Sequence, residues 1–232
     1  MFGDSFGILT SLFSGLAFVG IIATILLQKN ELELQRDELS LTRKEISIQN
    51  ETLKKQLFEN TFFQLIRTLN EIVSSLDLQK STSSRTTIST GRDCFIIFYR
   101  SLENAIQEKD SRGKPSGRHP KILEIINDRY VIFYKNHNQD LGHYFRLMYR
   151  IFLYIDNSEE INKLFYAKIL RSQISDYELA ILFYNGISEN GRNKFKPLIE
   201  KYSLFDNLPE SLIFDKSHKQ FYDEIAFGVK EK

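Results

Sequence analysis

The feature that most constrains this chain is an uncharged run near the amino terminus, between Asp4 and Lys29. The segment from Ser5 to Leu27 reads SFGILTSLFSGLAFVGIIATILL, and as an α-helix it measures about 34 Å. A bilayer core is about 30 Å thick, so such a helix can cross it with some tilt. The residues before it lack the basic charge of a signal peptide, and a soluble core helix is seldom apolar on every side. We therefore predict a single transmembrane segment over residues 1–28.

The charges that flank this segment indicate its orientation. Asp4 precedes it, whereas Lys29, Arg36, Arg43 and Lys44 follow it. Because positively charged flanks stay on the cytoplasmic side, we expect the amino terminus outside and residues 29–232 in the cytoplasm. The sequence thus predicts a single-pass protein of the inner cell membrane, with membrane lipid as its first partner.

Small residues recur at intervals of four within the predicted span, at Gly7, Ser11 and Gly15. Residues at this spacing form one stripe of a helix, and small side chains there let two helices approach closely in lipid. Glycine and serine are also common in membrane helices generally, so the pattern alone leaves both interpretations open.

Residues 29–57 contain no proline or glycine and are rich in good helix formers. Apolar side chains repeat every seven residues in two sets, on nearly opposite faces of a helix. The sets are Leu32, Leu39, Ile46, Leu53 and Leu34, Leu41, Ile48. A helix with two apolar stripes needs two neighbours, so we predict a coiled-coil-like stalk and a homo-oligomer. The alternative is a long helix that docks on its own domain.

Residues 58–232 are predicted to form an all-α domain of several helices. The helical pattern of the stalk is expected to continue from Phe58 to about Leu76. Further helices are expected at 92–107, 120–135, 139–155, 159–171, 176–185, 192–203 and 219–228, and loops at 81–90 and 109–120. One helix start is well marked, because Ser175 and Glu178 have the spacing of a capping box. Gly186 is expected to end that helix.

The segment 140–156, DLGHYFRLMYRIFLYID, is apolar over most of its helical circumference, which predicts a helix in the middle of the domain. Its narrow polar stripe consists of His143, Arg146 and Arg150. Charges next to so much apolar surface need partners, and we expect them among Asp176, Glu178 and Arg171. This stripe predicts either an internal ion-pair network or a pocket for an anionic ligand or trigger.

Composition and motifs argue against nucleic-acid binding, metal binding and catalysis. Lys and Arg number 31 against 30 Asp and Glu, so the chain lacks the basic excess of a general nucleic-acid binder, and no sequence-specific nucleic acid is expected. A single cysteine and scattered histidines predict no disulfide framework and no metal site. Arg112 and His119 have the spacing of a defence ribonuclease motif but lie in an expected loop. We predict no catalytic residues, no cofactor and no enzyme activity.

Several blocks resemble the putative phage abortive infection family, the AbiC-like proteins of bacteria. They are SGLAFVGIIATILLQ, FENTFFQLIRTLNEIV, GRDCFIIFY, LGHYFRLMYRIFLYID, ILRSQISDYELAILFYNGIS and FKPLIEKYSLFDNL, and they span nearly the whole chain in order. The resemblance implies a role in antiphage defence and a defence-system or phage protein as partner, without supplying a mechanism. Members often have two amino-terminal membrane helices, where this sequence has one.

Taken together, these features predict a membrane-anchored effector of abortive infection that acts by protein interaction, with membrane disruption as one route. A membrane-tethered scaffold or signalling module without toxicity is the main alternative. A defence ribonuclease is the least favoured.

Overall fold

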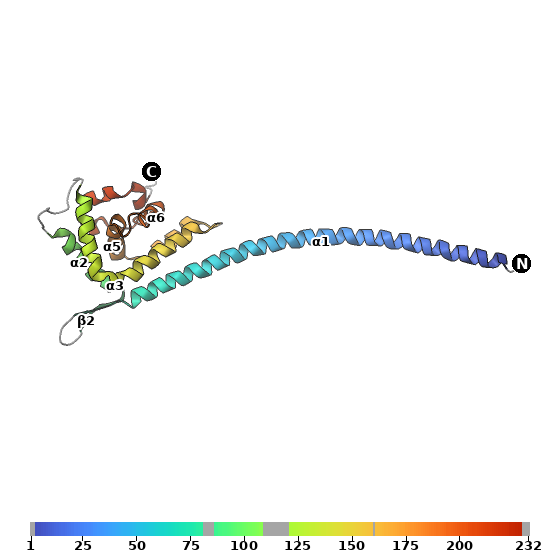
Figure 1. Cartoon of the computed structure of the whole chain (residues 1–232), viewed down its shortest axis with the longest axis horizontal. Helices are drawn as coiled ribbons and strands as arrows, with labels where there is room; N and C mark the ends of the chain where they lie inside the picture. Colours follow the sequence, from blue (N-terminus) through green and yellow to red (C-terminus); the bar gives the residue numbers. More distant parts are fainter. Residues whose placement is uncertain (1–2, 81–85, 109–120, 160, 229–232) are drawn as a thin grey trace. The chain divides into compact units, whose positions relative to one another are not determined.

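A computed structural model describes residues 3–80, 86–108, 121–159 and 161–228. The chain divides into two compact units, Met1–Leu57 and Phe58–Lys232, and the helix α1 (Gly3–Ser74) runs from the first into the second (Figure 1). Nearly all the regular structure is helical, so the predicted all-α class is confirmed.

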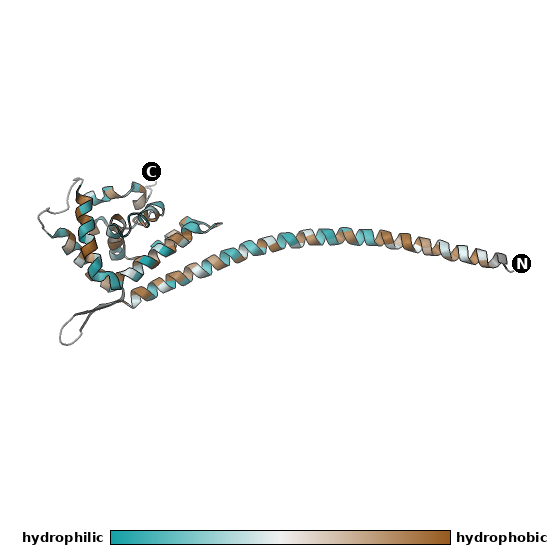
Figure 2. Cartoon of the chain, in the orientation of Figure 1, coloured by the Kyte–Doolittle hydropathy of each residue, from teal (hydrophilic) through white to brown (hydrophobic). Residues whose placement is uncertain are grey.

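The first unit consists of the amino-terminal part of α1. Hydrophobic residues dominate the end of α1 near the amino terminus, and hydrophobic and hydrophilic residues alternate further along (Figure 2). By length and composition, α1 contains one candidate membrane span, and none of its most apolar window is buried. The two apolar stripes of residues 29–57 are exposed as well: every leucine and isoleucine in them has at least 50% of its surface exposed.

The second unit begins where α1 first carries buried side chains. Phe58, Phe62, Ile66, Leu69 and Val73 recur every three or four residues and are all buried, as expected for one face of a helix against a core. This face shares its core with α2 (Cys94–Gln107), α3 (Ile122–Asn157), α4 (Lys163–Arg171) and α5 (Asp176–Ile187).

The helix α3 replaces the two helices expected at 120–135 and 139–155. The intervening polar residues contain no proline or glycine, so backbone hydrogen bonding continues through them. Figure 1 shows that α3 nevertheless changes direction between its first and second halves. The second half has the broad apolar face predicted for it, with Leu141, Tyr144 and Met148 among its buried residues.

The prediction of a loop at 81–90 was wrong for residues 86–90, which form a strand. Residues Asp77–Lys80 (β1) and Thr86–Thr90 (β2) form an antiparallel pair in which Asp77 faces Thr90 and Leu78 faces Ser89, followed by a bulge. Threonine and isoleucine are β-branched and suit a strand, so counting hydroxyl groups alone was misleading. Residues 81–85 and the expected loop at 109–120, with Arg112 and His119, lie outside the described residues.

The helix α5 is the most deeply buried helix in the second unit. Its capping box is present: the Ser175 side chain accepts from the Glu178 backbone N–H, and the Glu178 side chain accepts from the Ser175 N–H at 2.7 Å. Gly186 does not end the helix as predicted, because α5 continues to Ile187. It is instead a close-packing position, where a Cβ would lie 2.2 Å from the Tyr222 hydroxyl.

The carboxy-terminal residues are less regular than predicted. The helix expected at 192–203 is the short α6 (Lys196–Lys201), and the one expected at 219–228 consists of two 3₁₀ turns, η3 (Lys216–Phe221) and η4 (Glu224–Phe227). A further short turn, η2, spans Glu210–Leu212, and η1 (Gly91–Asp93) precedes α2. Asp215 and Asp223 accept hydrogen bonds from the backbone at the start of η3 and η4, which favours these tight turns over a longer helix.

Candidate anion-binding pocket

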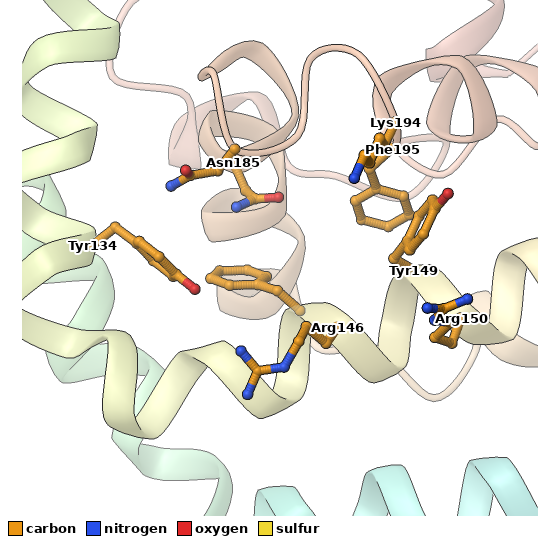
Figure 3. Close-up of a pocket in the computed structure, with 9 residues that line it drawn as sticks. Tyr134, Arg146, Tyr149, Arg150, Asn185, Lys194 and Phe195 are labelled. Atoms are coloured by element: carbon orange, nitrogen blue, oxygen red, sulfur yellow. The ribbon is translucent and has the colours of Figure 1, made fainter.

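A pocket of about 360 Å³ opens beside the second half of α3 and the segment that follows α5 (Figure 3). We call it the α3–α5 pocket. It is lined by three cations (Arg146, Arg150, Lys194), four aromatic rings (Tyr134, Phe145, Tyr149, Phe195) and two amides (Asn185, Asn190). None of these lining residues is acidic.

The helical period of α3 forms one wall of this pocket. Arg146 and Arg150 are four residues apart, as are Phe145 and Tyr149, so each pair lies on one face of the helix. Phe145 is buried and anchors the wall to the core, whereas both arginines are exposed. Figure 3 shows the two arginines projecting from α3, with Lys194 and Phe195 on the chain segment opposite.

A tight turn after α5 positions the other wall. The Phe195 N–H donates to the Gly191 carbonyl at 2.7 Å, and the Arg192 side chain donates to the Ile187 carbonyl at 2.9 and 2.8 Å. A Cβ on Gly191 would lie 2.5 Å from the Asn185 carbonyl, so only glycine fits there. The Asn185 amide donates to the Tyr130 hydroxyl at 2.9 Å, which fixes its orientation at the pocket wall.

The positive charge of the α3–α5 pocket is not balanced within the described part of the chain. Arg146 Nη2 lies 3.1 Å from His143 Nδ1, and this is the one hydrogen bond of the Arg146 guanidinium among the described residues. The side chains of Arg150 and Lys194 form no ion pair or hydrogen bond with any described residue. Like charges four residues apart on a helix repel each other, so an anion in this pocket would be electrostatically favoured.

The structure does not assemble the ion-pair network predicted from the sequence. His143, Arg146 and Arg150 are exposed rather than buried, because their stripe faces solvent and the pocket instead of α5. Arg171 pairs with Asp206, not with the start of α5. Asp176 is exposed in the first turn of α5, where a carboxylate interacts favourably with the helix dipole.

Glu178 is buried as its predicted pairing requires, but its basic partner is Arg92 from η1. The Arg92 Nε lies 3.4 Å from the carboxylate, which also accepts from the Ser175 hydroxyl at 2.5 Å. Arg92 further donates to the Gln173 carbonyl at 3.0 Å and to the Asn70 side chain at 3.3 Å. Burial, with the neighbouring Glu178 carboxylate, raises the pKa of Tyr144 on α3 well above its usual value. This cluster therefore joins the end of α1, η1 and the start of α5.

One pair of side chains with the geometry of a nucleophile and its base was not predicted from the sequence. The Ser101 Oγ lies 3.0 Å from His137 Nε2, between α2 and α3, a contact for which neither residue has a sequence motif. The imidazole packs against Phe98 and Phe133, with ring centroids 5.2 and 4.9 Å away. Burial lowers the pKa of His137 below its usual 6.5, against a smaller opposing effect of Asp140.

Other reactive groups are enclosed or dispersed. Cys94 is fully buried, and burial raises the pKa of its thiol. Within the described ranges, no three His, Cys, Asp or Glu side chains are grouped so as to hold a metal ion.

The predicted oligomer face lies entirely in the first unit. A Cβ added at Gly7 or Gly15 would meet no atom within 4 Å, and the Ser11 hydroxyl donates to the Ile8 carbonyl at 2.9 Å. Ser11 and Gly15 contribute to a shallow groove whose sides include Leu12 and Leu16. Leu32, Leu39, Ile46 and Leu53 follow on the exposed surface of the same helix.

The sequence pointed to the two arginines of the α3–α5 pocket as candidate site residues, but not to Lys194 or the aromatic residues of its walls. Arg146 and Arg150 interrupt a strongly apolar helix, which is a local signal. Lys194 lies more than forty positions further along, in a turn that appeared to be a helix start, and only the tertiary fold brings it to α3.

Comparison with known proteins relates part of this sequence to a family. No curated protein and no solved structure matches the chain. Eight of the nine residues that line the α3–α5 pocket, all but Tyr134, fall within a segment that matches a family model. That segment is 136–212, the family is described as putative phage abortive infection protein, and the similarity of this chain to it, inferred above from the residues, is confirmed.

Proposed function

We propose that this chain is a membrane-anchored effector of antiphage defence that acts through protein interaction rather than catalysis. The match of residues 136–212 to the abortive infection family is the observation that carries the proposal. The candidate span in α1 supports the membrane anchor. The basic residues that follow the span support an amino terminus outside and a cytoplasmic second unit, in the inner membrane.

The apolar stripes of α1 support self-association as part of the mechanism. Leucine and isoleucine side chains at least half exposed, repeating every seven residues, are unfavourable in water unless another helix covers them. Pairing of these stalks would raise the local concentration of the spans. Contact along Gly7, Ser11 and Gly15 would then bring the spans together in lipid, and injury to the membrane would follow from that contact.

A non-catalytic mode is supported by the surroundings of the reactive groups. Cys94 is enclosed in the core. The Ser101–His137 contact joins two packed helices, and neither residue lines the α3–α5 pocket.

The test combines phage plating with membrane potential in cells that express the full chain. The double variant Gly7→Leu/Gly15→Leu should remain in the membrane fraction, because leucine keeps the span apolar, but should lose protection and depolarisation. Gly20→Leu is the matched control: it lies on the opposite face of the helix, and a Cβ there also meets no atom within 4 Å. Full protection by the double variant would instead support a tethered scaffold.

A second variant tests the non-catalytic mode. Ser101→Ala removes the hydroxyl of the Ser101–His137 contact and should leave protection unchanged. Loss of protection with unchanged protein level and thermal stability would contradict this part of the proposal.

A further inference from the structure

We propose that the α3–α5 pocket binds a nucleoside phosphate, with the phosphate on the cations and the base against the aromatic walls. This inference does not rest on the proposed function, because it concerns binding alone. Three observations carry it: the unbalanced charge, the half-buried tyrosine rings and a side-chain amide oxygen at the pocket wall.

The phosphate side of the pocket follows from the charges. Arg146 and Arg150 line the pocket from α3 and Lys194 lines it from the opposite segment, so the pocket offers an anion guanidinium and ammonium groups from two elements. Guanidinium groups form paired, charge-assisted hydrogen bonds with phosphate oxygens. Because Arg150 and Lys194 have no ion-pair partner among the described residues, a phosphate would not have to displace one.

The base side follows from the aromatic rings. Tyr149 packs edge-on against the buried Phe195, with ring centroids 6.1 Å apart. Tyr134 packs against the buried Phe145, with ring centroids 6.0 Å apart. Tyr134 also stacks on Tyr130, with ring centroids 6.3 Å apart. Both pocket tyrosines are nevertheless only half-buried, so part of their ring surface remains exposed at the pocket. A simple inorganic anion makes no use of such surface, whereas a nucleobase stacks on it.

Asn185 supplies a polar group with a fixed direction. Its side-chain nitrogen donates a hydrogen bond to the Tyr130 hydroxyl, and its side-chain oxygen accepts no hydrogen bond from the described residues. That oxygen can accept from an amino group of adenine, cytosine or guanine. The volume of about 360 Å³ is near the lower end for small-molecule pockets, which favours a single nucleotide over a folded macromolecule.

The experiment is calorimetric titration of the purified full chain in detergent micelles with AMP, adenosine and inorganic phosphate. AMP should bind, and adenosine and phosphate should each bind at least about tenfold more weakly, because each lacks one half of the contacts. Arg150→Gln and Lys194→Gln should each weaken AMP binding about tenfold. Tyr149→Leu should weaken it about fivefold or more while leaving phosphate binding unchanged.

The matched control is Arg100→Gln, which removes an exposed arginine from α2, outside the pocket. It should bind AMP like the parent. Three outcomes would overturn the proposal: no AMP binding, phosphate binding as tight as AMP, or equal weakening by Arg100→Gln. If AMP does not bind, and poly-glutamate binds and is weakened by Arg150→Gln and Lys194→Gln but not by Arg100→Gln, the pocket belongs to an acidic protein instead. Nucleotide binding by the purified chain does not depend on phage protection, so failure of the defence proposal would leave these results intact.

Discussion

Removing the Arg92 side chain should destabilise the second unit more than its partly exposed position suggests. Arg92 is 45% exposed, but the Glu178 carboxylate opposite it is only 1% exposed. In Arg92→Ala that carboxylate would keep the Ser175 N–H and hydroxyl and lose its cation. Breaking a fully buried ion pair costs about 3–5 kcal/mol. Because solvent screens Arg92, we expect about 2–3 kcal/mol.

The assay can be confined to the second unit. All 11 tyrosines lie beyond residue 57, and the chain has no tryptophan, so tyrosine fluorescence and near-ultraviolet circular dichroism report tertiary structure in that unit. With the full chain in detergent micelles, a loss of about 2–3 kcal/mol should lower Tm by about 5–10 °C. Arg100→Ala, an exposed arginine on α2, is the control and should change Tm by no more than about 2 °C.

A double-mutant cycle tests the cause of this loss. Glu178→Gln combined with Arg92→Ala removes the uncompensated charge, so the double variant should be at least about 1 kcal/mol more stable than the sum of the single effects. If Arg92→Ala matches Arg100→Ala, or if the two effects simply add, the argument that Arg92 neutralises a buried carboxylate is refuted.

Two further predictions concern packing and pH. Gly186→Ala should lower the stability of the second unit by about 1–3 kcal/mol, measured in the same melts, because its Cβ would meet the Tyr222 hydroxyl, which is held by the Phe183 carbonyl at 2.7 Å. Burial, with the Glu59 carboxylate that accepts from its hydroxyl, raises the pKa of Tyr166 from 10 to about 12. The unfolded chain therefore releases this proton first, so stability present below pH 10 is lost as the pH rises towards 12, and Tyr166→Phe should flatten that decline in denaturant titrations.

Local signals in the sequence were sufficient for the elements whose structure depends on near neighbours. The capping box at Ser175 is a contact between residues three positions apart, and the apolar face of 140–156 is a matter of helical period. Both appear as predicted. The hairpin was missed because the strand tendency of Thr86–Thr90 is weaker than its resemblance to a polar loop.

The partners of charged residues were not predictable in the same way. Arg92 and Glu178 are more than eighty positions apart, and no local pattern distinguishes Arg92 from other arginines as the partner of that carboxylate. The same holds for Lys194 in the α3–α5 pocket. Arg146 and Arg150 are charges in an apolar helix, but their long side chains reach solvent at its edge and do not require buried acids.

The enclosure of Cys94 makes this chain suitable for disulfide mapping of its own assembly. A fully buried thiol with a raised pKa reacts slowly with maleimides and oxidants, and the chain has no other cysteine. Cysteines introduced singly along the exposed positions 32, 39, 46 and 53 could therefore be cross-linked without first removing the native one. Each dimer band on a non-reducing gel would then report a specific pair of neighbouring helices, position by position, in intact membranes.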